Sequence, residues 1–301
     1  MSAKNPEKRT AVITASYSND LERCRLLCES LDANLLGKWR HYILVESADV
    51  EMFRSLESPH REIINERDIL PRWIRPFNDP VSRRHKRVWL SPYTMPLRGW
   101  HIQQLRRFGI GRMIDEDLLF SADSDVVLVR KFDPVLLWAG DNIRFYRRDN
   151  AIDATMQEHV DWSLQAGKVL HLDKAREAPP FHDYINTLIG WRRDTLLGLL
   201  DHVERVNGMH WARAIARNRR ISECTIYGRY VDDVLAGAGH NPDPRPLCHV
   251  MWNAGEEGGK PDDLSNFAAA LEPGQVGVGI QSFIGHDINE IRKSLAIGTV
   301  R

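Results

Sequence analysis

Short apolar runs and helically spaced apolar residues alternate along the first hundred residues. Runs rich in β-branched and aromatic residues predict strands, and leucines recurring every three or four positions predict a helix. Asn19 and Asp20 stand where the first helix should be capped, and Gly37 stands where it should end. The expected strands are residues 10–17, 41–46 and 61–65, and the expected helices are residues 21–36 and 50–56. This alternation predicts βαβ units and a parallel sheet.

The remaining two thirds of the chain predict a mixture of helices and strands. Residues 69–98 contain five prolines and a basic run ending at Arg87, and so predict a long irregular segment with a function. Ser222 is expected to cap a helix, and residues 242–246 are expected to form a turn. Further helices are expected at residues 99–108, 193–206 and 211–217, and further strands at residues 143–147, 247–252 and 276–284. We expect one α/β domain over residues 1–301, with a mostly parallel central sheet flanked by helices.

The pattern of residues 118–129 (LLFSADSDVVLV) places three polar residues between two apolar runs. We interpret it as a buried strand that delivers Asp123 and Asp125 to the edge of a sheet. Two carboxylates so close together would repel each other and bind protons unless a cation lay between them. Oxygen ligands of this kind favour Mg²⁺ or Mn²⁺. On these residues alone, a turn capped by Asp123 with a solvated Asp125 is the alternative.

Composition narrows the class of protein. A chain of 301 residues with 43% hydrophobic content can bury a large core, and its 41 basic and 41 acidic residues create no overall field that would attract nucleic acid. No apolar run approaches the roughly 20 residues of a membrane span, and residues 1–9 lack the apolar region of a signal peptide. We therefore expect a cytoplasmic protein without a transmembrane segment.

The cysteines predict packing rather than metal binding. Cys24 and Cys28 share one helix face, and Cys224 and Cys248 lie far away in the sequence, so no tetrahedral zinc site is expected. Reduced thiols are the expected state.

The expected helix at residues 99–108 carries polar residues on one face. Trp100, Gln103, Gln104 and Arg107 follow the i, i+3, i+4, i+7 spacing of neighbours on a helix surface. Two amides and a guanidinium could recognise a polar ligand. A solvated helix face with Trp100 packed beneath it is the alternative.

Four segments together resemble bacterial nucleotide-diphospho-sugar glycosyltransferases of the GT-A fold. They are TASYSND at 14–20, GWHIQQLRR at 99–107, LFSADSDVVLVRKFD at 119–133 and ISECTIYGRYV at 221–231. The likeness covers most of the chain, and the Gln-Gln helix before the Asp-x-Asp (DxD) motif is more specific than that motif alone. It implies a GT-A-like single domain with a nucleotide-binding half at about residues 10–135 and an acceptor-side half at about residues 136–301.

The resemblance also implies a set of site residues. Asp123 and Asp125 would hold Mn²⁺ or Mg²⁺ and, through it, the diphosphate of the donor, with a UDP-sugar as the preferred donor. Thr14 and Ser16 could instead satisfy the backbone of a turn. The residues implied to line the donor nucleotide are Thr14, Ser16, Tyr17, Asp20, Glu46, Gln103, Gln104, Arg107 and Ser124.

Two residues of the second half, Glu223 and His249, complete the expected site. Glu223 follows Ser222 at a helix start, where the helix dipole ordinarily favours a carboxylate. Under the resemblance it is the catalytic residue, which deprotonates or orients the acceptor hydroxyl. We expect His249, rather than His286, to approach the metal, because a neutral imidazole inside an apolar strand needs a partner. A satisfied core histidine is the alternative.

The expected function is that of a metal-dependent, hexosyltransferase-type glycosyltransferase. It would move a sugar from a nucleotide-diphosphate sugar to a hydroxyl of a glycan or lipid-linked acceptor in bacterial envelope polysaccharide or glycolipid synthesis. It would act in the cytoplasm, or through peripheral contact at the inner face of the cytoplasmic membrane, with no nucleic acid partner. One alternative is an aspartate-nucleophile phosphatase with Asp232 and Asp233 as distal metal ligands. The other is a sugar-nucleotide-binding protein without turnover.

Overall fold

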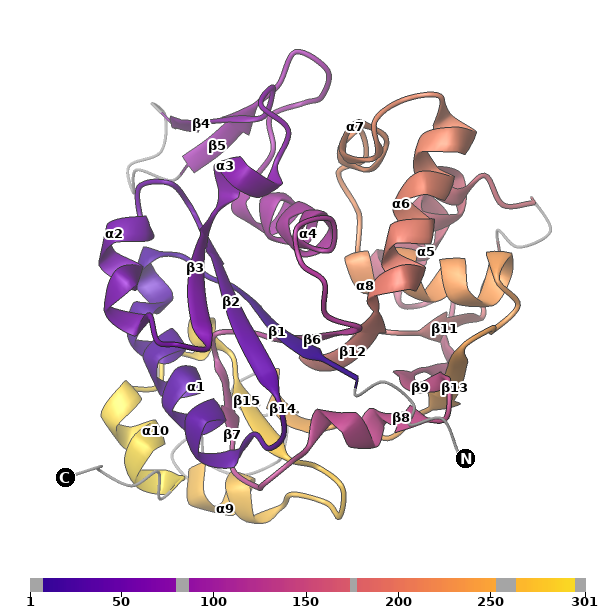
Figure 1. The fold of residues 1–301 in the computed structure, drawn as a ribbon. Helices are drawn as coiled ribbons and strands as arrows, with labels where there is room; N and C mark the ends of the chain where they lie inside the picture. The colour runs from indigo at the N-terminus through magenta and orange to yellow at the C-terminus, as the bar shows by residue number, and fades with distance from the viewer. Residues whose placement is uncertain (1–7, 80–86, 174–177, 253–263, 296–301) are drawn as a thin grey trace, which may run out of the picture.

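A five-stranded sheet in the order β12-β6-β1-β2-β3 forms the centre of the computed structural model (Figure 1). The structure describes residues 8–79, 87–173, 178–252 and 264–295, apart from the side chains at positions 265 and 283. Strands β1, β2, β3 and β6 run parallel, and β12 runs antiparallel to β6. The strands are β1 (Thr10–Ala15), β2 (Trp39–Val45), β3 (Arg61–Asn65), β6 (Leu118–Ala122) and β12 (Leu188–Arg192). The predicted mixed α/β fold with a mainly parallel central sheet is confirmed.

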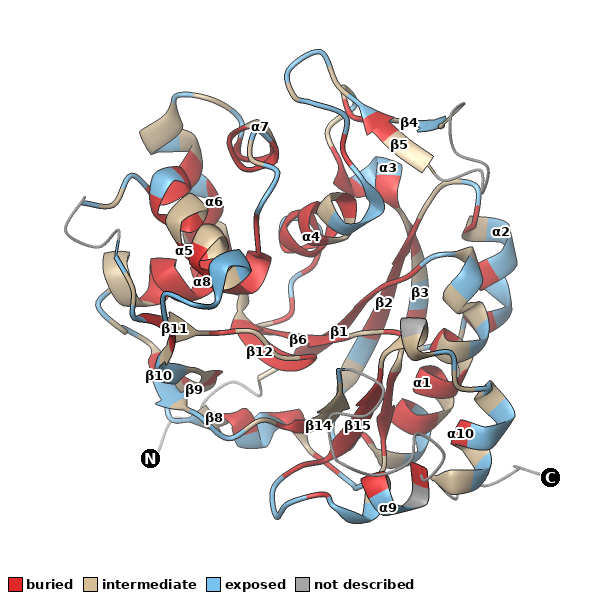
Figure 2. Ribbon diagram, turned by 180° about the vertical axis from the view of Figure 1, so that it is seen from behind, coloured by how far each residue is buried: buried red, intermediate tan, exposed pale blue. Residues whose placement is uncertain are grey.

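Helices cover both faces of this sheet because its strands are apolar on both sides. Val12 packs with Leu27 and Leu31 of α1 (Leu21–Asn34), whereas its neighbour Ile13 belongs to the core that contains α4. That larger core joins both halves of the chain (Figure 2). The helices around it are α4 (Gly99–Ile110), α5 (Gln157–Leu170), α6 (Arg193–Asn207), α7 (Trp211–Ala216) and α8 (Glu223–Arg229), and α2 (Val50–Phe53) lies beside α1.

A second, smaller sheet begins directly after the Asp-Ser-Asp motif. Strand β15 (Gly277–Ile280) lies between β7 (Val126–Leu128) and β14 (Cys248–Met251), antiparallel to β7 and parallel to β14. Helices α9 (Leu264–Ala269) and α10 (Ile288–Ser294) lie nearby in both ribbon views. The two apolar runs that flank the motif therefore belong to different sheets, which their sequence did not reveal.

The remaining strands form three small sheets. One contains β8, β9 and β13, another pairs β10 with β11, and β4 pairs with β5 in an antiparallel ribbon. Their bounds are β8 (Trp138–Ala139), β9 (Asn142–Tyr146), β13 (His240–Asp243), β10 (Arg148–Ile152), β11 (Phe181–Asp183), β4 (Arg75–Asn78) and β5 (Arg87–Leu90). Short helical turns lie at α3 (Glu66–Ile69), Ser18–Asp20, Arg54–Leu56, Pro134–Leu137, Tyr230–Val234 and Ser282–Ile284.

Three local predictions need correction. Residues 69–98 are not irregular throughout, because β4 and β5 within this segment pair as an antiparallel ribbon. The basic residues 83–86 lie outside the described residues. Asp20 precedes α1 but makes no capping hydrogen bond, since its carboxylate is engaged elsewhere. The expected turn at 242–246 begins inside β13. The Ser222 cap is confirmed, because its side chain accepts a hydrogen bond from the Thr225 amide.

Gly228 offers a test of how α8 packs against Tyr184, the residue that follows β11. A Cβ at Gly228 would lie 2.2 Å from the ring of Tyr184, whereas a Cβ at Gly99 in α4 would meet nothing within 4 Å. We expect Gly228→Ala to lower the free energy of unfolding by about 1–3 kcal/mol or more, because the ring must move. Gly99→Ala is the matched helical control and should be neutral or slightly stabilising. Equal urea midpoints for the two variants would contradict this packing.

Candidate functional site

The carboxyl ends of β1 and β6 meet where the strand order reverses. From β1, the chain proceeds to β2 and β3 on one side, whereas β6 pairs on the other side (Figure 1). Open α/β sheets bind ligands outside the carboxyl ends of the strands at such a switch point. The residues that follow these two ends are Ser16 to Asp20 after β1 and Asp123 to Asp125 after β6.

Asp125 lies between the two sheets with only part of its carboxylate satisfied. Its backbone carbonyl accepts from the Ile280 amide at 3.1 Å, and its Oδ2 accepts from the Ser282 amide at 3.3 Å. Its Oδ1 is buried and has no hydrogen-bond partner within the described chain. Burial, followed by the charges of Asp123 and Asp20, raises the pKa of Asp125 to about 7. This carboxylate is therefore held in a place that calls for a cation or a proton.

Asp20 joins the same group from the β1 side. The Ser124 hydroxyl donates to Asp20 Oδ2 at 3.4 Å and so connects the two strand ends directly. Burial raises the pKa of Asp20, and the charge of Asp123 raises it further. Arg23 in α1 opposes both effects, and its guanidinium donates to the backbone carbonyls of Ile280 and His286 at 3.1 and 3.0 Å. Three carboxylates thus converge on one short stretch of the sheet edge.

Arg107 connects the motif to the second half of the chain. Its Nη2 donates to Asp123 Oδ1, and its Nη1 donates to Glu223 Oε1 at 2.6 Å. Burial disfavours the charged guanidinium, but the two carboxylates outweigh that effect, so the pKa of Arg107 is raised. Glu223 itself is buried in the first turn of α8. The structure therefore brings Glu223 to the strand-end carboxylates, as the sequence predicted, with one guanidinium between them.

The other polar residues of α4 have different surroundings. Gln104 is buried, and its Nε2 donates to the Ile221 carbonyl at 3.3 Å, so this amide joins α4 to the segment before α8. Gln103 is half-buried, and Trp100 is 43% exposed, with its ring beside that of Trp162. Trp100, Gln103, Gln104 and Arg107 share a helix face, as their spacing predicted, but their side chains do not converge on one point.

Thr14 and Ser16 are buried, and the Ser16 hydroxyl has no hydrogen-bond partner among the described residues. Thr14 Oγ1 donates to the Ala122 carbonyl at 2.9 Å and lies 2.9 Å from His41 Nε2, while His41 Nδ1 accepts from Arg61 Nε at 3.0 Å. This chain of hydrogen bonds links β6, β1, β2 and β3, from the carboxyl end of β6 to the first residue of β3. In the loop after β1, Tyr17 and Asn19 are exposed, and the Tyr17 side chain is 43% exposed.

Glu46 marks the carboxyl end of β2. Its carboxylate pairs with Arg87 of β5 at 2.6 Å, and burial raises its pKa while Arg87 lowers it. Next to it, Glu66 after β3 accepts from Trp89 Nε1 at 3.2 Å and from the Arg106 guanidinium. Glu46 is thus a half-buried anchor for the β4–β5 ribbon at the same edge of the sheet.

The two candidate histidines have different surroundings. The His249 ring stacks on Phe267 of α9 with ring centroids 4.2 Å apart. Burial raises the pKa of the preceding Cys248 thiol, and the charge of Asp125 raises it further. Because adjacent strand residues point to opposite faces, His249 points away from the carboxylates. His286 follows Ser282, which binds Asp125, and its backbone carbonyl accepts from Arg23. The arrangement favours His286 over the predicted His249 as the histidine beside the motif.

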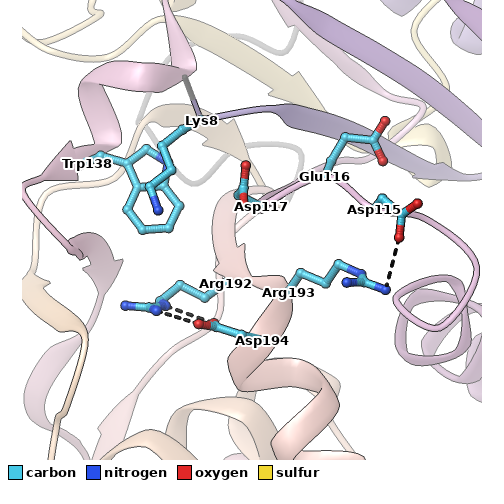
Figure 3. Close-up of a pocket in the computed structure, with 8 residues that line it drawn as sticks. All are labelled: Lys8, Asp115, Glu116, Asp117, Trp138, Arg192, Arg193 and Asp194. Atoms are coloured by element: carbon cyan, nitrogen blue, oxygen red, sulfur yellow. Dashed lines mark hydrogen bonds and ion pairs between the residues drawn. The ribbon is translucent and has the colours of Figure 1, made fainter. Parts of the chain in front are cut away.

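A cavity of about 100 Å³ lies at the other end of the sheet, where β1 and β6 begin (Figure 3). Its charged lining is already paired, for example Arg192 with Asp194 and Arg193 with Asp115. It contains none of the predicted site residues. The residues around it are Lys8, Asp115, Glu116, Asp117, Trp138, Arg192, Arg193 and Asp194.

A protein-family model matches the part of the chain that contains Asp20, Asp123 and Asp125. Residues 10–238 match a family described as a family of unknown function, DUF6492. The chain belongs to this family. The match includes the central sheet, Arg107, the Asp-Ser-Asp motif and Glu223, whereas β14, β15 and both candidate histidines lie beyond it. A search of curated proteins found no match.

In this member of DUF6492, the described side chains do not form a complete metal site. No three His, Cys, Asp or Glu side chains in the described ranges are arranged to hold a metal ion. The buried, unpartnered Oδ1 of Asp125 is the kind of oxygen that a hard cation takes as a ligand, with water and phosphate completing the shell. Asp123 keeps Oδ2 for such a cation, because Arg107 binds Oδ1.

Sequence reasoning missed Arg23, His41, Arg61 and Ser282. Arg23 is three positions after Asp20, a spacing that could have suggested their pairing. His41 and Arg61 look like ordinary strand residues, and Ser282 reaches Asp125 only through the register of β15 on β7.

Proposed function

We propose that this protein is a metal-dependent glycosyltransferase that uses a nucleotide-diphosphate sugar. The observation that carries the proposal is the group of Asp20, Asp123 and Asp125 at the switch point of a parallel sheet, with the Asp125 Oδ1 buried and unpartnered. Such an edge is where α/β sheets bind nucleotides, and such carboxylates are suited to a cation that carries phosphate. The GT-A resemblance of the four segments supports the same reading.

Asp123 and Asp125 are the residues proposed to hold Mn²⁺ or Mg²⁺, with His286 preferred to His249 as a third ligand. When bound, the cation neutralises the charge that grows on the departing diphosphate. Tyr17 is proposed to contact the base of the donor, with UDP-sugar as the preferred donor. Thr14, Ser16 and Gln104 are proposed to position the strand ends and α4 rather than to touch the ligand.

Glu223 is the proposed acceptor-side residue. Arg107 binds its Oε1, which leaves Oε2 to accept a hydrogen bond from the acceptor hydroxyl. In the transfer, the acceptor oxygen bonds to the anomeric carbon, the bond from that carbon to the diphosphate oxygen breaks, and the hydroxyl proton passes to Glu223 or to water that it orients. Arg107 keeps the carboxylates of the two halves at a set separation.

The phosphatase alternative loses support because its proposed distal ligands are engaged elsewhere. Asp232 accepts from Arg147 at 2.8 Å and from the Tyr184 hydroxyl at 2.7 Å, and Asp233 accepts from Arg229 at 2.8 Å. A binding protein without turnover would share the donor site. Hydrolysis of UDP-sugars assayed with and without Mn²⁺ separates the three readings: metal-dependent release of UDP supports a transferase, binding without release supports a binding protein, and phosphate release from simple phosphoesters supports a phosphatase.

Glu223→Gln should separate acceptor chemistry from donor binding. We expect turnover to fall by about 10²–10⁴-fold, the typical contribution of a positioned acid or base. The affinity for UDP with Mn²⁺ should stay within about twofold. Glu158→Gln is the matched control, because Glu158 also occupies a helix first turn but is exposed. Isothermal titration and a UDP-release assay make the measurement, and full turnover in Glu223→Gln would remove the residue from the mechanism.

A further inference from the structure

The β4–β5 ribbon and the segments on either side of it carry exposed apolar and basic residues. We propose that this surface, the ribbon tip, binds an anionic phospholipid membrane. The proposal goes beyond glycosyl transfer and does not depend on it. No helix in the described ranges is long and apolar enough to cross a bilayer, so any contact of those ranges would be peripheral. The ribbon tip consists of Arg72, Arg75, Phe77, Leu90, Tyr93 and Met95.

Strand register separates the two faces of the ribbon. Arg75 pairs with Leu90 and Phe77 with Val88, so these side chains share the outward face. Trp89 points to the other face and is 2% exposed. Phe77, Leu90, Tyr93 and Met95 are 50, 40, 47 and 57% exposed, respectively. Phe77 and Leu90 share the outward face, and Tyr93 and Met95 lie in the segment that follows β5. Several large exposed apolar side chains within one short region commonly mark an interaction surface.

The ribbon is firmly attached to the body of the protein. Trp89 donates to buried Glu66, and Arg87 pairs with Glu46 at 2.6 Å. The segment after β5 folds back, because Trp89 and Leu97 exchange backbone hydrogen bonds of 3.0 and 2.9 Å. The outward apolar residues therefore lie on a ribbon that is held to the body of the protein by buried contacts.

The charge of the ribbon tip favours an anionic partner. Arg72 and Arg75 are exposed, and within the described residues neither guanidinium pairs with a carboxylate. Arg213 of α7 adds a third cation, 4.7 Å above the ring of Tyr93. Apolar side chains flanked by arginines suit the interface of an anionic bilayer, where the apolar groups enter the headgroup boundary and each cation adds electrostatic attraction.

The position of the ribbon relates this surface to the candidate site. Glu46 and Glu66 follow β2 and β3 at their carboxyl ends, so the ribbon is attached at the edge of the parallel sheet at which β6 also ends (Figure 1). If the proposed function also holds, the acceptor is a lipid-linked hydroxyl compound.

Vesicle co-sedimentation tests the proposal with the full chain. We expect binding to vesicles of phosphatidylglycerol and phosphatidylcholine, with little binding to phosphatidylcholine alone. Arg72→Glu with Arg75→Glu should weaken binding at least about tenfold, since each cation near an anionic surface contributes about fivefold. Phe77→Ser with Leu90→Ser should weaken it similarly. The control is Met52→Ser with Leu136→Ser, because these side chains are 48 and 72% exposed on other elements.

Three results would overturn the proposal. They are no binding of the wild-type chain to anionic vesicles, ribbon-tip variants that bind as well as the control, and binding that does not depend on lipid charge. Gel filtration adds a fourth: a wild-type dimer that the Phe77 and Leu90 changes dissociate would assign the surface to a second copy of the chain instead. Circular dichroism checks that each variant is folded. Donor hydrolysis is not part of the readout, so a failure of the glycosyltransferase proposal leaves the vesicle result intact.

Discussion

Asp125→Asn should abolish metal-dependent binding of UDP and leave the protein folded. The substitution keeps the shape of the side chain but removes the charge that a cation needs, and Asp123→Asn should act in the same way. Isothermal titration of UDP with Mn²⁺ should show no saturable binding for either variant, and Asp125→Ala and Asp123→Ala should agree. Asp141→Asn, an exposed position, is the control. Unchanged metal-dependent binding in both motif variants would falsify the assignment of the site.

The same variant should remove a pH dependence of stability in metal-free protein. The pKa of Asp125 is raised to about 7 from an ordinary value of 3.8, so between these values the folded state holds a proton that the unfolded chain has lost. The free energy of unfolding therefore falls as pH rises from about 4 through 7. The wild type should lose on the order of 3 kcal/mol relative to Asp125→Asn across this window. Urea unfolding at pH 4.5 and 8 measures it, and added Mn²⁺ should restore wild-type stability at pH 8.

Arg107→Met should be among the most destabilising changes in the chain. The guanidinium is buried and compensates both Asp123 and Glu223, so its removal leaves two carboxylates without their cation. We expect the free energy of unfolding to fall by about 3–5 kcal/mol at pH 7, as for other buried pairs that lose one partner. Arg112→Met removes exposed pairs with Asp201 and Glu204 beyond the end of the same helix and should cost about 1 kcal/mol or less.

A triple variant identifies the cause of that loss. Neutralising the two carboxylates with Asp123→Asn and Glu223→Gln in the Arg107→Met background should recover much of the stability, because no uncompensated charge is then buried. Urea midpoints at constant slope make the comparison. If the triple variant is no more stable than Arg107→Met alone, packing of the arginine stem, and not its charge, explains the loss.

The pattern of apolar residues was enough to predict most of the elements that build the site. Leucine spacing predicted α1 and α6, and β-branched runs predicted β1, β2 and β3, because side-chain periodicity reflects which face of an element is buried. The ribbon of β4 and β5 was missed because its strands are four residues each and prolines interrupt the pattern.

The local sequence also predicted that Asp123 and Asp125 stand at a strand end and that Glu223 begins a helix. Both features can be recognised from a few neighbouring residues, because an apolar run marks the strand and a capping residue marks the start of the helix. Tertiary structure decided what those carboxylates meet. Arg107 reaches both halves because α4 packs between the sheet and α8, Ser282 reaches Asp125 through the pairing of β15 with β7, and strand alternation turns His249 toward Phe267. The physical reason is that periodicity specifies which side of an element is buried, whereas contacts between distant elements depend on the order and register in which they pack.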